Sequence, residues 1–427
     1  MTMQMILALG VLIFMIVLIM TDALPFGAPP LLASLLIVVF QLYPQDADPI
    51  AYAFSGFVNS NVWMIAFFMV VLAGFQKTRL TGKIRSSMLG LVEKGGLKSY
   101  VLLLLLVMLG CTLTGGGSTG YYVLILSLVA TIPYNEQLPT SKLLMPLGFA
   151  ANHPLIPLNV AIFYGLTATM LDSAGISMNG TSTIPFMVMS AVASVAFLIW
   201  SIAGFKLLPD HPIAEAEKDS AASAESEGLP AWKEAVTIIS LLVSVVGMMF
   251  IDSFGAIAYI LPGLCAFILL AIKVIDWKEF RENLFSPVIL MMTCVIPVAN
   301  ALADSGFTAM VGNAVAGAVS GLPLFFIILI FAFLCSACAT LTGASFGSAF
   351  VFVPIVIATC QAMGVDPVGA AAATVMAAWA GGFLPIDGLP AMIMGMGKYS
   401  MSEYWKFTIP MYIIGIFALA LGAVLAF

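Results

Sequence analysis

The feature of this sequence that most constrains its fold is a succession of apolar segments, each long enough to cross about 30 Å of hydrocarbon as a helix. Hydrophobic residues fill 62% of the 427 positions and charged residues only 8%. A water-soluble domain of this composition would have too few polar residues to cover its surface. The segments lack the short alternating pattern of transmembrane strands. The sequence therefore predicts an all-α polytopic membrane protein. The segment starting at Met5 has no basic region or small-residue cleavage site, so we expect a span rather than a signal peptide.

Twelve membrane-embedded units are predicted, in two sets of six. A linker at 209–233, rich in small, charged and Pro/Gly residues, separates the sets. The first set, within 1–208, comprises 5–21, 25–43, 60–76, a hairpin at 99–133, a broken helix at 143–171, and 185–207. The second set, within 234–427, comprises 236–251, 254–273, 285–303, a hairpin at 322–362, a broken helix at 366–397, and 404–427. Two further segments, 77–99 and 303–321, are predicted to be helices on the membrane surface.

The second set repeats the first. The phrase "TLTG" occurs at 112–115 and again at 340–343, and at the same offset of 228 Pro157 falls on Pro385. If both termini lie outside, and each hairpin enters and leaves by one face, all 15 Lys and Arg residues are cytoplasmic. The acidic residues outside are then Asp46, Asp48, Asp172, Asp252, Asp304 and Asp366. The repeats are therefore predicted to be inverted, with hairpins entering from opposite faces.

Each repeat contains a run that breaks a helix in mid-membrane, "LTGGGSTG" at 113–120 and "LTGASFGS" at 341–348. Each glycine in a helix costs about 1 kcal/mol relative to alanine, and backbone groups freed in lipid need partners. Such backbone can coordinate a cation through carbonyls or face an anion through N–H groups. Close helix packing explains either run alone. Their duplication favours hairpin tips that bind ions, as in secondary transporters with inverted repeats.

A second break follows each hairpin. Pro154 and Pro157 in the first repeat, and Pro385 and Pro390 in the second, are expected to unwind a helix beside the hairpin tip. Asp387, in the second break, is predicted to be a sodium ligand, a proton carrier or the partner of a cation, with a helix cap as the alternative.

His153, in the first break, is the other ionisable residue placed deep in the membrane. Its neutral imidazole can satisfy freed carbonyls, and a protonated one can pair with an anion. The six cysteines are expected to be packing residues. With two histidines and no nucleophile elbow, HExxH motif or phosphate loop, the chain is not expected to be an enzyme.

Two stretches, "FSGFVNSNVWMIAFFMVVLAGFQKTRLTGKI" at 54–84 and "GVDPVGAAAATVMAAWAGGFLPIDGLPAMIMG" at 364–395, resemble the divalent-anion/sodium symporter family of the ion transporter superfamily. The resemblance implies an inverted-repeat fold and an elevator motion of the hairpin domain against a dimeric scaffold. The family's Ser-Asn-Thr at each tip is replaced here by residues 116–118 and 344–346, and its Thr-Pro-Pro-Asn by residues 388–391. The glycine-rich first tip is also similar to the large membrane subunit of tripartite (TRAP) transporters.

From residues and resemblance together, we expect a sodium-coupled symporter for a small organic anion, a carboxylate or a sulfonate, in a bacterial inner membrane. The expected partners are the anion, sodium ions, membrane lipids and a second copy in a homodimer, with no nucleic acid. The alternatives are a proton-coupled transporter and a tripartite subunit that needs a binding protein. The predicted sodium ligands are Thr114, Gly116, Ser118, Gly148, Asn152, Thr342, Ala344, Ser348, Ala380 and Asp387. The predicted substrate-binding residues are Gly117, Ser118, Thr119, Asn159, Ser345, Phe346, Asp387 and Gly388.

Overall fold

The computed structural model of the chain describes residues 1–20, 24, 28–79, 91, 96–114, 119–130, 138–178, 182–211, 229–319, 321–342, 345–385 and 388–427. Within these ranges all regular secondary structure is helical, as predicted. The predicted tip residues Gly116, Gly117, Ser118 and Ala344, and the predicted ligand Asp387, lie outside the described residues.

The helices of the first half end before the linker. They are α1 (Met3–Met20), α2 (Ala28–Val39), α3 (Pro49–Ala53), η1 (Ser55–Val58), α4 (Ser60–Gln76), α6 (Gly96–Thr114), α7 (Thr119–Ala130), α8 (Thr140–Ala150), α9 (Ala161–Ser173), α10 (Ile184–Ala203) and η2 (Gly204–Leu207).

The helices of the second half follow the linker. They are α11 (Ala231–Met249), α12 (Ile251–Phe254), α13 (Ala256–Ala271), α14 (Trp277–Leu284), α15 (Pro287–Asp304), α16 (Phe307–Val319), α17 (Leu324–Thr342), α18 (Ser345–Met363), α19 (Val368–Ala377), α20 (Gly388–Gly397) and α21 (Met401–Ala426).

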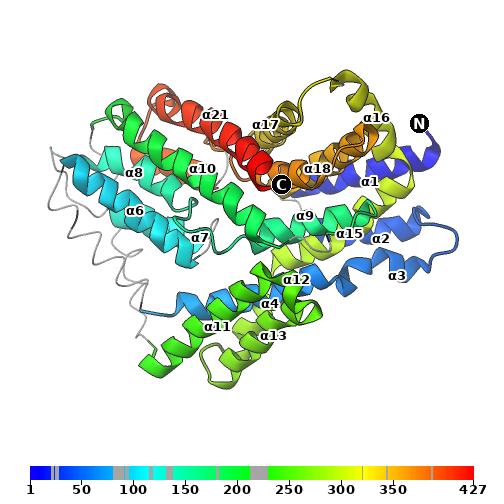
Figure 1. Cartoon of the computed structure of the whole chain (residues 1–427), viewed down its shortest axis with the longest axis horizontal. Helices are drawn as coiled ribbons and strands as arrows, with labels where there is room; N and C mark the ends of the chain where they lie inside the picture. Colours follow the sequence, from blue (N-terminus) through cyan, green and yellow to red (C-terminus); the bar gives the residue numbers. More distant parts are fainter. Residues whose placement is uncertain are drawn as a thin grey trace.

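Helix–break–helix units occupy both predicted hairpin positions. Helix α6 ends at Thr114 and α7 begins at Thr119, while α17 ends at Thr342 and α18 begins at Ser345. In Figure 1, α6 and α7 lie toward one end of the long axis, and α18 lies toward the other end along α16. Entry of the two hairpins from opposite faces stays a prediction.

The two predicted broken helices are interrupted in the middle. Residues 151–160 separate α8 from α9, and α20 begins only at Gly388 after α19 ends at Ala377. Proline lacks the N–H that an inner helical turn requires, so Pro154 and Pro385 prevent the helices from continuing. In the second loop Gly382 adopts φ +109°, which a side chain would strain.

The halves of the broken helices pack crosswise. Helix α8 packs on α7 and on α20, which is the second half of the other broken helix, whereas α19 packs on α17, α18 and α9. Two hydrophobic cores result: a smaller one built on α6, α7, α8 and α20, and a larger one that includes α9 and α17–α19. Both unwound loops therefore lie where the two cores meet.

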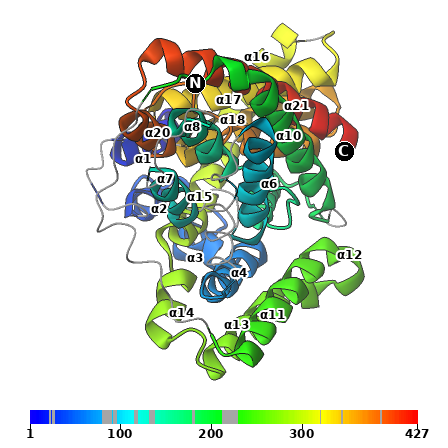
Figure 2. The ribbon, with the colours of Figure 1, turned by 90° about the vertical axis from the view of Figure 1, so that its left-hand side faces the viewer.

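A separate group of helices lies to one side. Helix α4 packs on α11, α13 and α14, and Figure 2 shows these four helices below the rest, away from α8, α20 and α21. Long helix α21 runs along α10, where Gly422 allows close approach because an added Cβ would meet the Met189 backbone at 2.9 Å.

Five described helices are long and apolar enough to cross a membrane, and a bent pair makes a sixth. The bent pair joins 293–304 to α16 at 68°. Gly306, with φ +80°, makes the turn. Helix α16 falls within the segment 303–321 that was predicted to lie on the membrane surface. It packs along α18, and the contact is close because a Cβ at Gly312 would overlap Ala358.

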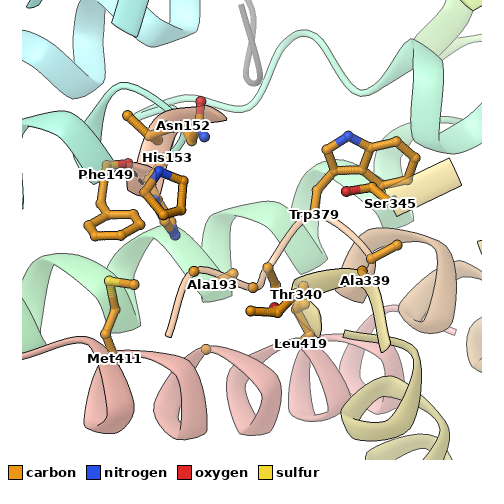
Figure 3. Close-up of a pocket in the computed structure, with 17 residues that line it drawn as sticks. Phe149, Asn152, His153, Ala193, Ala339, Thr340, Ser345, Trp379, Met411 and Leu419 are labelled. Carbon is orange, nitrogen blue, oxygen red and sulfur yellow. Dashed lines mark hydrogen bonds between the residues drawn. The ribbon is translucent and has the colours of Figure 1, made fainter. Parts of the chain in front are cut away.

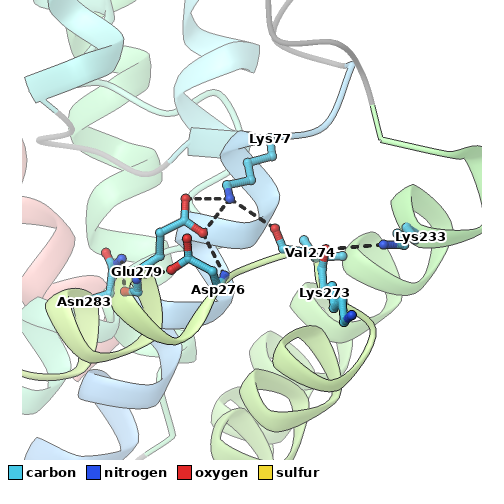
Figure 4. Close-up of polar contacts among 7 residues, drawn as sticks. All are labelled: Lys77, Lys233, Lys273, Val274, Asp276, Glu279 and Asn283. Atoms are coloured by element: carbon cyan, nitrogen blue, oxygen red, sulfur yellow. Dashed lines mark hydrogen bonds and ion pairs between the residues drawn. The ribbon is translucent and has the colours of Figure 1, made fainter.

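Basic residues from both halves lie near one another where α4 ends beside α14 and α11 (Figure 4). Lys77, which follows α4, pairs with Glu279 of α14 at 2.6 Å and donates to the Val274 carbonyl at 3.1 Å. Lys233 donates to the Lys273 carbonyl at 3.3 Å. Lys77, Lys233 and Lys273 thus lie close together, and their cytoplasmic location stays a prediction.

Candidate functional site

A cavity of about 90 Å³ lies where the unwound loops and the second hairpin meet (Figure 3). It is lined by residues from both loops, from α17 and α18, and from α10, α20 and α21. They are Phe149, Asn152, His153, Ala193, Ala339, Thr340, Ser345, Ala378, Trp379, Ala380, Gly381, Gly382, Leu389, Pro390, Met411, Gly415 and Leu419.

In the first half the unwound loop is hydrogen-bonded to its hairpin. Leu155 N donates to the Met108 carbonyl and Ile156 N donates to Thr112 Oγ1, both at 2.9 Å. Thr112 Oγ1 in turn donates to the Met108 carbonyl at 3.1 Å. The freed backbone groups of the loop thus find partners on α6, at Met108 and Thr112, six and two residues before the helix ends at Thr114.

The second half has the same local arrangement. Thr340, 228 positions after Thr112, donates to the Ser336 carbonyl at 2.9 Å. Gly381 of the second loop lies so close to Thr340 that an added Cβ would overlap the threonine hydroxyl. Only glycine permits this approach of loop to hairpin.

His153 closes one wall of the cavity. Its ring stacks on Phe197 of α10, with centroids 4.0 Å apart and an interplanar angle of 10°. Nδ1 donates at 2.8 Å to the Phe149 carbonyl near the end of α8, which also accepts from Asn152 N at 2.9 Å. The bond and the stacking fix the ring beside the cavity, and both roles expected for this histidine stay predictions.

Trp379 forms the opposite wall together with aromatic residues of two other elements. Its indole lies edge-on to Phe346 at the start of α18, with centroids 4.8 Å apart, and to Phe163 of α9 at 5.6 Å. These three rings, the aromatic wall, tie the second loop to the second hairpin and to the first broken helix.

Of the predicted site residues, Asn152, Ser345 and Ala380 line the cavity. Phe346 does not line it but contacts the lining residue Trp379. The other predicted residues within the described ranges are not among those that line the cavity. Gly148 is a packing position, since a Cβ there would meet Ile393 at 2.8 Å. Ser348 is buried with Oγ unpaired among the described residues, and Asn159 belongs to the first loop but not to the lining.

Four more predicted positions lie at element ends. Thr114 and Thr342 end α6 and α17, whereas Thr119 and Gly388 begin α7 and α20.

The sequence prediction missed several lining residues. Thr340 lies inside the repeated "TLTG" phrase, and its offset of 228 from Thr112 was an available signal. No sequence signal identified the lining residues of α21, which are Met411, Gly415 and Leu419, because an apolar residue that faces a cavity looks the same in sequence as one that faces lipid.

The helix ends around the cavity suit both kinds of ion. Helix α18 begins at it with Ser345, and α20 reaches it with Leu389 and Pro390 of its first turn; the N–H groups of a first turn favour an anion. Helices α8, α17 and α19 end near it, and their last carbonyls favour a cation. No Lys, Arg, Asp or Glu is among the described residues that line it, so polar side chains and backbone would bind the solute.

Comparisons with known proteins agree with this geometry. The family model CitMHS, described as "Citrate transporter", matches residues 16–328 and 285–427. An uncharacterized Escherichia coli transporter, YfbS, is 28% identical over 195 residues, which are 44% of this chain and 31% of that protein. The chain thus spans less than a third of that relative's length.

Two solved structures share the fold. One is the YdaH transporter of Alcanivorax borkumensis, with TM-score 0.62, 15% identity, and coverage of 92% of this chain and 98% of that one. The other is Neisseria gonorrhoeae MtrF, described as illuminating a class of antimetabolite efflux pumps, with TM-score 0.63, 14% identity and 94% coverage of both chains.

Proposed function

The chain belongs to the citrate transporter family, and from that premise we propose that it is a sodium-coupled symporter of a small carboxylate. The observation that carries the proposal is the convergence of helix ends from both broken helices and the second hairpin on one cavity. Interrupted helices that meet at mid-membrane are how secondary transporters hold charged solutes. The family and the fold are those of transporters, so the solute leaves chemically unchanged.

The anion is proposed to bind at the N-terminal ends of α18 and α20, near Ser345 and Gly388. The predicted anion ligand Asn159 takes part only if the first loop shifts. Sodium is proposed to bind at the carbonyl-rich ends of α6 and α17, with Asn152, Ala380 and Asp387 contributing oxygens. One sodium ion that moves down 100 mV releases about 2.3 kcal/mol, so two or more per anion suffice for uphill uptake.

The cavity size bears on the transport cycle. About 90 Å³ holds a few water molecules or a small anion, far less than the roughly 300–1,000 Å³ of sites that enclose larger organic ligands. A polycarboxylate such as citrate would therefore require the second hairpin to move away from α10 and α21. We propose that this movement belongs to an elevator motion of the hairpins against the helices around α4, in a homodimer with both termini outside the bacterial inner membrane.

Uptake by the purified protein in liposomes tests the proposal. Radiolabelled citrate, smaller carboxylates and sulfonates are offered with an inward gradient of sodium or, as control, of choline. We expect uptake of a carboxylate to require sodium and to fall by at least tenfold in Ser345→Trp, which fills the cavity. Ser402→Trp, an exposed serine at the start of α21, is the matched control and should transport normally.

The outcomes separate the alternatives. Uptake driven by a pH gradient and abolished in Asp387→Asn would replace sodium by protons. Uptake only after a binding protein is added would indicate a tripartite subunit. Equal uptake by Ser345→Trp and Ser402→Trp would remove the site assignment.

A further inference from the structure

A second cavity, of about 640 Å³, lies apart from the first at the bend between α15 and α16. Its walls come from α3, the end of α9, α15, α16 and α18. The residues that line it are Tyr52, Asp172, Ser173, Ala174, Gly175, Asn300, Ala303, Asp304, Thr308, Ala309, Asn313, Ala358, Gln361 and Ala362. It therefore touches the second hairpin from the side away from the first cavity.

The lining of this second cavity is polar and bears one sign of charge. Asp172 and Asp304 supply carboxylates, Asn300 and Asn313 supply amides, and no lysine, arginine or histidine is among the described residues that line it. Asp304 accepts a 2.7 Å hydrogen bond from the Tyr52 hydroxyl. Burial raises the pKa of Tyr52, and this hydrogen bond raises it further, so the hydroxyl stays protonated and donates. The cavity would repel a free anion and attract a cation.

Asp172 has no cationic partner within the described part of the chain. It lies one residue beyond the predicted membrane unit 143–171, and burial raises the pKa of its carboxyl. Its carboxylate accepts a hydrogen bond from Asn61 of α4, which is 5% exposed and donates from Nδ2 to Asp172 Oδ2 at 3.4 Å. Asn61 Oδ1, on the same amide, is buried with no hydrogen-bond partner among the described residues.

Asn300, which lines the cavity directly, repeats this pattern. Its Oδ1 is also buried and also lacks a partner in the described ranges. A buried carbonyl oxygen left unpaired is costly, and in native proteins such groups mark an ordered water or ion. Asn300 Oδ1 thus provides an acceptor in the same lining as the Asp172 carboxylate, which provides charge, whereas Asn61 is not a lining residue and contacts Asp172 through Nδ2.

We propose that the second cavity binds a hard metal cation through Asp172 and Asn300, with Asn61 positioning the Asp172 carboxylate from α4. Both donors are oxygens, which suit Na⁺, Mg²⁺ and Ca²⁺ rather than softer metals. The described residues hold no group of three or more His, Cys, Asp and Glu side chains that could ligate a metal, so the amide oxygen of Asn300 is indispensable. A cation there links α9 and α15 next to α18.

Cation-dependent stability of the full-length protein in detergent tests the proposal. After treatment with a chelator, thermal unfolding is followed while NaCl, MgCl₂ or CaCl₂ is added at ionic strength held constant with choline chloride. A ligand that binds only the folded state raises the apparent melting temperature in a concentration-dependent way. We expect one of these cations to do so in the wild type, and Asp172→Asn to weaken its apparent affinity at least tenfold.

Two further variants make the result specific. Asn300→Leu keeps the branched shape of the side chain but removes the unpaired oxygen, so it should raise stability without metal and abolish the response to the cation. Asp46→Asn removes a carboxylate that is exposed on the same predicted face, and it should respond as the wild type does.

The proposal is overturned if none of the three cations acts beyond ionic strength, or if Asp46→Asn weakens the response as much as Asp172→Asn. It is also overturned if Asn300→Leu responds normally. Which salt acts identifies the cation. Because the readout is binding and not uptake, the proposal stands or falls independently of the proposed transport activity.

Discussion

Gly381 is the position at which the second unwound loop touches the second hairpin, and a single methyl group there tests whether that contact holds the site together. A Cβ at position 381 would overlap Thr340 Oγ1, whereas Thr340 Cβ at 3.4 Å and the Ser336 carbonyl oxygen at 3.7 Å would remain in ordinary contact. The threonine hydroxyl is therefore the one group that must move.

Moving this hydroxyl breaks the 2.9 Å bond to the Ser336 carbonyl. A net hydrogen bond is worth about 1 kcal/mol, and a buried polar group left unpaired costs about 1–3 kcal/mol. Overpacking by one methyl group gives a similar figure of about 1–3 kcal/mol. We expect Gly381→Ala to lower the free energy of unfolding by an amount in this range and to reduce uptake, because the loop and the hairpin line the same cavity.

The assay is reversible unfolding of purified variants in detergent, in a double-mutant cycle with Thr340→Ala. Removing the hydroxyl removes the collision, so the double variant should be more stable than the two single effects predict, by at least about 0.5 kcal/mol. Gly395→Ala is the matched control, because nothing lies within 4 Å of a Cβ there and alanine is the better helix former. Additive effects, or Gly381→Ala as stable as the wild type, would refute the reasoning.

Three other predictions follow from the same structure. Thr112→Val removes the oxygen that accepts from Ile156 N at 2.9 Å; it should cost about 1–3 kcal/mol of unfolding free energy, and an unchanged melting curve would contradict the pairing of first loop and hairpin. Lys77→Met should lower the free energy of unfolding by no more than about 1 kcal/mol, because both side chains of its ion pair with Glu279 are about one-third exposed. A coupling energy well above this value, in a double-mutant cycle with Glu279→Gln, would contradict the prediction. Trp379→Ala should enlarge the cavity and raise uptake of larger carboxylates relative to smaller ones, and an unchanged ratio in competition assays would exclude the indole from the solute's path.

Much of the architecture is predictable from the sequence because lipid allows few solutions. Backbone in hydrocarbon must be hydrogen-bonded within its own segment, so apolar length alone predicts the helices, and interruptions such as Pro154 and Pro385 predict where they break. The repeated "TLTG" phrase even predicts the equivalent positions of Thr112 and Thr340, which the structure places in the same local geometry.

The composition of the site was decided by packing. The sequence predicts that loops and hairpin tips meet, but not that α8 packs on α20 while α19 packs on α9, which is what brings Asn152 and Trp379 to one cavity. Two glycines show the same limit. Gly148 and Gly381 look equivalent in the sequence, yet Gly148 packs against Ile393, whereas Gly381 lets the second loop approach Thr340. A residue type and its spacing determine what a segment can become, whereas contacts between segments distant along the chain arise only when the helices cross.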